Sequence, residues 1–205
     1  MAGLAAVAAR QPGVIESMFS YVGKSVQQGY TVDVYNVRLY NKSQGALTIM
    51  VDTLLPAGGS YYAQTCGDCL WVALAEKAYA YAADRGWVNA SNNGASGYAR
   101  LAGGLGKWSL SAIMGRREQE VGTSSVAVTA KQAWNAGVPF TLGTGSNPHF
   151  RLHQNHEYAL VGYDSTSAQP FIIFNPHNQG AYNGNGQQYG SAFTASEGYL
   201  MAFVS

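Results

Sequence analysis

The chain has few charged residues and few cysteines, and each shortage removes a class of function. Charged residues make up only 11% of its 205 residues, and twelve basic side chains against eleven acidic ones leave no basic stripe for nucleic acid. Two cysteines cannot build a disulfide framework. No stretch of sequence is apolar over the length that a bilayer span needs. We therefore expect neither nucleic acid nor a membrane span.

The beginning of the sequence also lacks a feature, namely the basic leader of a secretory signal. Its first residues, MAGLAAVAARQPG, are apolar, and Arg10 comes early. We therefore expect no signal peptide. This favours the cytoplasm but leaves the compartment open, and the sequence does not indicate the oligomeric state.

Apolar residues are abundant, at 47% of the chain, enough for one substantial core or for two lobes that share a cleft. Residue patterns predict helices over 2–9, 14–22, 70–81 and 128–137, with short helical pieces near 98–101 and 110–116. They predict strands over 30–41, 45–55, 138–144, 156–164, 170–176 and 198–205. This order indicates an α+β fold with a helical N-terminal lobe that includes a β-hairpin, residues 1–125, and an antiparallel β lobe, residues 126–205.

Two polar side chains stand at the ends of predicted strands. His156 opens the strand HEYALVGYD, and Asn175 closes the next one, PFIIFNP. If the two strands are antiparallel neighbours, both side chains lie at one end of the sheet, where the amide oxygen can accept an imidazole N–H and select one tautomer. The remaining histidines, His149, His153 and His177, fall in expected loops without metal-ligand spacing.

Both cysteines lie in the segment QTCGDCLW, just before the predicted helix at 70–81. The positive end of a helix dipole lowers the pKa of a thiol, so Cys69 is a candidate nucleophile. Cys66 and Cys69 also form a C-x-x-C pair of the thioredoxin type, but no parallel βαβ pattern surrounds them. Cys69 could equally be a small residue at the start of a structural helix.

The chain resembles the protease core of calpains, which are papain-like cysteine peptidases, over almost its whole length. The likeness rests on segments that follow the family's order, among them YNVRLYN, LTIMVDTLLP, LWVALAEKAYA, GYARLAGG, GVPFTLGT, HEYALVGYD and FNP. It implies a papain-like two-lobed fold and a cysteine endopeptidase that acts on extended polypeptide bound in the cleft. It also implies that His156 is the catalytic base and acid and that Asn175 orients it.

The resemblance leaves two positions open for the nucleophile. In calpains a Gly-Asp-Cys-Trp segment precedes an alanine- and leucine-rich stretch that AGLAAVAARQPGVIESMF resembles, so the family cysteine would lie just upstream of Met1. Alternatively, QTCGDCLW resembles the papain pattern, with Cys69 as nucleophile and Gln64 as an oxyanion donor. Gln64 precedes Cys69 by five residues, where the papain pattern has six.

The resemblance also bears on cofactors and partners. Animal calpains respond to calcium, but no ligand residues can be assigned here, and we expect no cofactor. His177 follows Pro176, where calpains have a Trp that shields the His–Asn hydrogen bond from water. The partner is therefore either a polypeptide substrate or, if the domain is a non-catalytic relative, a bound peptide or protein.

Overall fold

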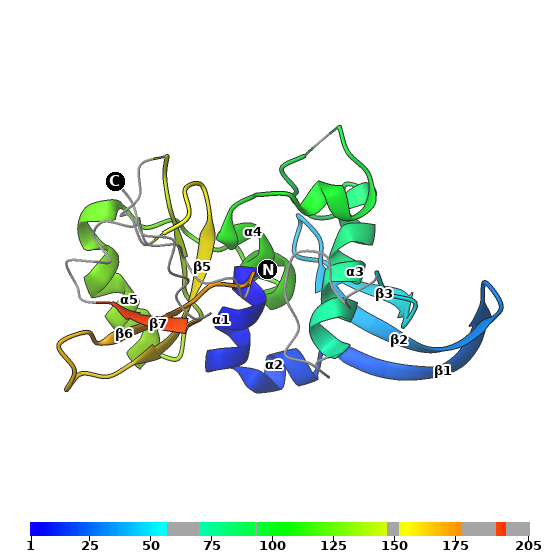
Figure 1. Cartoon of the computed structure of the whole chain (residues 1–205), viewed down its shortest axis with the longest axis horizontal. Coiled ribbons are helices and arrows are strands. Elements are labelled where there is room, and N and C mark those ends of the chain that lie inside the picture. The colour runs from blue at the N-terminus through cyan, green and yellow to red at the C-terminus, as the bar shows by residue number, and fades with distance from the viewer. Residues whose placement is uncertain (57–69, 93, 147–151, 178–191, 196–205) are drawn as a thin grey trace, which may run out of the picture. The chain divides into compact units, whose positions relative to one another are not determined.

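The structure, a computed structural model, describes residues 1–56, 70–92, 94–146, 152–177 and 192–195. It is a mixed α and β protein with antiparallel sheets, so the expected α+β class is confirmed (Figure 1). The chain divides into two compact units. Unit 1 contains residues 1–12, 105–110 and 118–205, and unit 2 contains residues 13–104 and 111–117.

The helices and strands are named as in Figure 1. The helices are α1 (Ala2–Arg10), α2 (Pro12–Glu16), α3 (Leu70–Asp84), α4 (Gly106–Met114) and α5 (Val126–Asn135), with 3-10 turns η1 (Gly97–Leu101) and η2 (Thr123–Ser125). The strands are β1 (Phe19–Gln27), β2 (Tyr30–Tyr40), β3 (Ala46–Asp52), β4 (Thr141–Gly143), β5 (Glu157–Tyr163), β6 (Phe171–Phe174) and β7 (Ala192–Ala195). The strand expected over 198–205 lies outside the described residues.

Unit 2 contains the three-stranded antiparallel sheet β1-β2-β3. The predicted pairing of 30–41 with 45–55 is confirmed as β2 with β3. The helix expected over 14–22 is wrong in its second half, because α2 ends at Glu16 and β1 begins at Phe19. Gln28 and Gly29 both have positive φ, 50° and 84°, and join β1 to β2 in the tight two-residue turn that antiparallel hairpins favour. This turn allows β1 to pair with β2, so residues 19–22 form part of a strand and not the predicted helix.

Helix α3 packs against β2 and β3 within unit 2. Its Lys77 ammonium bonds the Asp52 carboxylate at 2.7 Å and also donates to the carbonyl oxygens of Asp52 and Leu54. The lysine thus ties the middle of α3 to the end of β3. This helix begins at Leu70, as predicted, and runs three residues beyond the predicted end.

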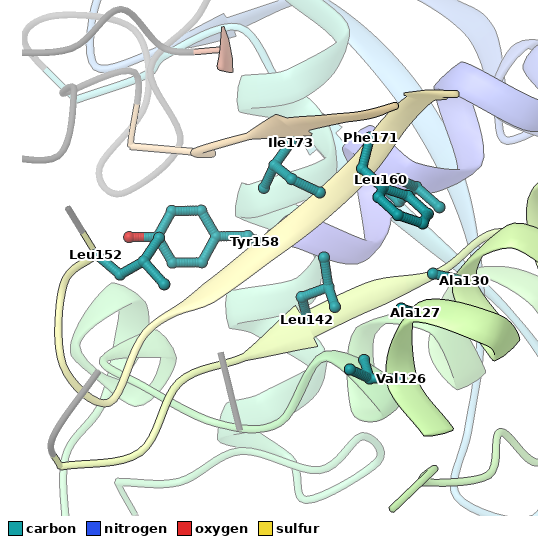
Figure 2. Packing of buried hydrophobic residues seen from close by; sticks show 9 residues of the cluster. All are labelled: Val126, Ala127, Ala130, Leu142, Leu152, Tyr158, Leu160, Phe171 and Ile173. Atoms are coloured by element: carbon teal, nitrogen blue, oxygen red, sulfur yellow. The ribbon is translucent and has the colours of Figure 1, made fainter. Parts of the chain in front are cut away.

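Unit 1 is built on the four-stranded antiparallel sheet β4-β5-β6-β7, with α5 packed against it. Figure 2 shows the shared core, in which side chains of α5 point toward those of the sheet and of the loop before β5. The buried cluster consists of Val126, Ala127, Ala130, Leu142, Leu152, Tyr158, Leu160, Phe171 and Ile173. Helix α1 also packs against β5, where Ala159 is fully buried.

Helix α5 ends as the sequence predicts. Gly137, the second residue after the end of the helix, has φ of 71° and donates its N–H to the Trp134 carbonyl oxygen, while Val138 donates to that of Ala133. These two bonds form a Schellman motif, in which glycine is favoured because it has no β-carbon. The chain then turns directly into the segment that leads to β4.

The observed units differ from the expected division at residue 125. Residues 1–12 belong with the strand-rich unit, because α1 contacts β4 and β5. The first half of α4 also belongs to unit 1 and its second half to unit 2. Unit 2 is not mainly helical, since it holds a complete three-stranded sheet.

The contact between α1 and α4 allows a stability prediction. A β-carbon on Gly3 would stand 2.9 Å from the backbone nitrogen of Leu110, closer than real contacts allow. We expect Gly3→Ala to lower the free energy of unfolding by about 1–3 kcal/mol, because the helices must move apart. Urea denaturation followed by circular dichroism measures this change.

The matched control is Gly13→Ala in α2, where no atom lies within 4 Å of the added carbon. We expect it to change the free energy of unfolding by less than about 1 kcal/mol, because alanine favours a helix and meets no neighbour. Equal destabilisation by both variants would refute the close approach of α1 and α4.

Candidate active site

His156 and Asn175 lie at the same end of the unit 1 sheet. His156 immediately precedes β5, Asn175 immediately follows β6, and the two strands are antiparallel partners. Ala159 pairs with Phe174, so the next place in the register sets Tyr158 opposite Asn175. Nε2 of His156 lies 2.8 Å from Oδ1 of Asn175. The structure therefore brings together the two side chains that the strand ends indicated.

A second hydrogen bond determines the orientation of the Asn175 amide. The backbone N–H of His177 donates to Oδ1 of Asn175 at 3.1 Å, which identifies this atom as the oxygen. An oxygen can only accept from the ring, so Nε2 of His156 carries the proton and Nδ1 is the basic nitrogen. Asn175 is 1% exposed, so little water competes for its oxygen.

Three aromatic rings surround the imidazole of His156. The ring of His177 lies with its centroid 4.6 Å away and that of Tyr158 4.9 Å away, both at 82° to it, and that of His153 lies 5.5 Å away at 68°. These edge-to-face contacts restrict rotation of the ring and leave it half-buried.

This environment makes His156 a weak base. The pKa of His156 is lowered from 6.5 to about 4, mainly by burial and also by repulsion from His177 and His153, against the opposing effect of the Asn175 hydrogen bond. The pKa of His177 is also lowered, mainly by burial. The imidazole of His156 is therefore neutral at pH 7 and can accept a proton.

The start of α1 lies close to this site. The charge of the amino terminus lowers the pKa of His156 and of His177, so it stands within electrostatic range of both rings. Helix α1 begins at Ala2, and the same helix packs against β5.

The other predicted site residues are not placed. Cys69 and Gln64 lie outside the described residues, as do Cys66 and His149. Within the described ranges, no group of three or more His, Cys, Asp or Glu side chains could hold a metal ion. None of the helices seen in the described segments has the length and apolar character of a membrane span.

Sequence reasoning missed three residues of this site. His153 and His177 were assigned to loops, yet both rings contact His156. Thr144, just after β4, contacts the backbone of His156 through its hydroxyl. The position of His177 two residues after Asn175 was a usable signal, whereas nothing in the local sequence marks Thr144.

No family model matches the chain, and no curated protein is significantly similar to it. The function must therefore be argued from the site itself.

The first prediction for the site concerns the ring pKa. Asn175→Asp replaces the amide by a carboxylate of equal size, and we expect it to raise the pKa of His156 from about 4 to above 6.5, because an adjacent anion stabilises the imidazolium. The signal of the ring Cε1–H proton, followed by NMR over pH, measures the pKa. His177→Phe keeps a ring and removes one charge, so it should give a smaller rise. An unchanged pKa in Asn175→Asp would contradict the observed contact.

The second prediction concerns stability and pH. His156 has a lower pKa in the folded chain than in the unfolded chain, so its contribution is complete above pH 6.5 and is lost as the pH falls toward 4. Because the ring is half-buried, we expect a loss on the order of 1–2 kcal/mol. Urea unfolding at pH 7.5 and 4.5 measures it, and His156→Gln should show a smaller difference between the two pH values. An equal difference in the variant would show that other groups cause the loss.

Proposed function

We propose that this chain is a calpain-like cysteine endopeptidase domain of the papain-like, two-lobed class, hydrolysing peptide bonds through a Cys/His/Asn mechanism. The observation that carries the proposal is the 2.8 Å contact between Nε2 of His156 and Oδ1 of Asn175. It leaves Nδ1 as the proton acceptor on a ring that its neighbours hold in place. This is the arrangement that a thiol nucleophile needs in its base.

In this mechanism, Nδ1 of His156 takes the proton of a cysteine thiol. The thiolate attacks the carbonyl carbon of the substrate, and collapse of the tetrahedral intermediate breaks the peptide bond. The imidazolium gives its proton to the leaving amine, and an acyl-enzyme remains. A water molecule then gives a proton to His156 and hydrolyses the thioester, which restores the thiol. Asn175 holds the ring in one tautomer throughout.

The nucleophile is assigned to the position immediately before α1, upstream of Met1. The family likeness supports this position, because calpains have their cysteine before the corresponding alanine- and leucine-rich stretch. Helix α1 also packs against β5, the strand that His156 precedes, so the start of this helix belongs to the same unit as the base. A thiolate there would gain from the helix dipole and from the imidazolium. On this proposal the 205 residues supply the base and its orienting residue, and the sulfur comes from upstream. Cys69 is the alternative nucleophile.

A non-catalytic function, in which the domain binds a peptide or protein partner, is the second candidate. The observation that favours it is His177, which packs on His156 where the family has a shielding Trp. A polar and ionisable ring at this place shields the His156 side of the hydrogen bond from water less well than an apolar indole would. A binding domain would tolerate that loss more easily than a peptidase.

The test is covalent labelling with a papain-type epoxysuccinyl inhibitor, read by mass spectrometry of the modified peptide. It compares this chain with the same chain carrying its natural upstream residues, each with His156 intact and as His156→Ala. We expect labelling of an upstream cysteine, and a fall of about 10²–10⁴-fold in its rate in His156→Ala, because the base is lost. The matched control is Cys69→Ser, which should leave the labelling unchanged.

Three other outcomes each decide against part of this proposal. Labelling of Cys69 that depends on His156 would place the nucleophile within this chain. Absence of any His156-dependent labelling in the extended chain would exclude the peptidase and leave the binding domain. A redox-active disulfide between Cys66 and Cys69, without peptidase activity, would indicate a thiol-disulfide enzyme.

A further inference from the structure

The hydroxyl of Thr144 occupies an unusual place in the ladder between β4 and β5. Gly143 pairs with Glu157, so Thr144 and His156 are the next pair in the register. The N–H of Thr144 donates to the carbonyl oxygen of His156 at 2.9 Å, as in a regular antiparallel pair. The return bond differs, because the N–H of His156 donates to Oγ1 of Thr144 at 2.8 Å and not to a backbone oxygen.

The same hydroxyl also binds the turn that leads into His156. Oγ1 of Thr144 lies 2.6 Å from the carbonyl oxygen of His153 and 3.1 Å from that of His156. A hydroxyl has one proton to donate and can accept at least one bond. The shorter contact identifies the His153 carbonyl as its acceptor, while the His156 N–H occupies the oxygen. One side chain therefore satisfies two backbone groups of the segment that carries the base.

The backbone between these two contacts is held in a strained shape. Asn155 has φ of 49°, in the left-handed region that asparagine tolerates better than most residues. Its N–H donates to the carbonyl oxygen of Gly145, and the N–H of His153 donates to the hydroxyl of Tyr158. The turn over residues 153–155 is thus fixed at both ends, and its exit sets the direction of the bond from Cα to Cβ of His156.

We propose that Thr144 is the positioning residue of this site. Its hydroxyl accepts the His156 N–H, which a backbone carbonyl oxygen would accept in a regular antiparallel pair, and this directs the His156 ring toward Asn175. The catalytic meaning of this proposal rests on the proposed function. The hydrogen bonds between the Thr144 hydroxyl and the backbone of His153 and His156 do not depend on that function. Thr144 acts through His156 and does not touch substrate. A residue without a hydroxyl cannot replace it, because the site needs a donor and an acceptor on one atom.

The test uses Thr144→Val, which keeps the shape and removes the hydroxyl, and Thr144→Ser, which keeps the hydroxyl. NMR of the 205-residue chain with ¹⁵N-labelled histidine reports the tautomer and pKa of His156 without any need for a nucleophile. We expect wild type and Thr144→Ser to have the proton on Nε2 alone. In Thr144→Val we expect a mixture of tautomers, a pKa that rises from about 4 toward 6.5, and exchange of the His156 amide faster by about tenfold or more.

Ile173→Val is the control for a general loss of stability. It removes one buried methyl group from the core cluster without touching Thr144, so it should leave the tautomer of His156 unchanged. If Thr144→Val lowers the melting temperature but keeps the single tautomer, Thr144 is only structural and the proposal is overturned. If Thr144→Val does not fold, hydrogen exchange of the His156 backbone N–H in the wild-type chain tests the proposal instead. An amide that exchanges as freely as an exposed one overturns the proposal, and a protected one supports it.

The two proposals fail in different ways. If the labelling experiment excludes a peptidase, the tautomer measurements still show whether Thr144 sets the ring of His156. If Thr144→Val leaves the ring unchanged while an upstream cysteine is labelled, the peptidase stands and Thr144 has no positioning role.

Discussion

The site depends on the antiparallel pairing of β5 with β6 and on where those two strands end. The pairing brings a ring and an amide that are 19 residues apart within 2.8 Å. A slip of one residue in either strand would turn its side chains to the other face and separate the pair. Burial of Tyr158, Phe171 and Ile173 in the core opposes such a slip (Figure 2). The hydrophobic core of unit 1 therefore keeps the polar site in register.

The hydrogen bonds of the site fix the orientation of the His156 ring and of the Asn175 amide. A buried amide oxygen accepts from both the His156 ring and the His177 backbone, so neither the amide nor the ring can flip without losing a bond. Burial keeps the ring neutral at pH 7, and a nearby anion would raise its pKa by stabilising the charged form.

Much of the fold could be predicted, and the errors have local causes. The ends of β5 and β6, the start of α3 and the glycine after α5 follow from residue patterns that act over a few neighbours. Strand β1 was missed because its first residues, 19–22, fall in a stretch with a helical pattern, whereas the turn at Gln28 and Gly29 pairs the strand with β2. The compact units join distant parts of the sequence, because α1 packs against strands more than a hundred residues later in the chain.

Residue types and spacings alone indicated that His156 and Asn175 would meet, because each stands at a strand end and strands alternate in direction. They could not indicate that His153 and His177 would pack on the ring, nor that Thr144 would hold its backbone. Those contacts depend on how loops close and where side chains point, and loops obey weaker local rules than strands. The meeting of His156 and Asn175 could thus be predicted from the sequence. The surroundings that set the pKa and orientation of the His156 ring were decided only by three-dimensional packing.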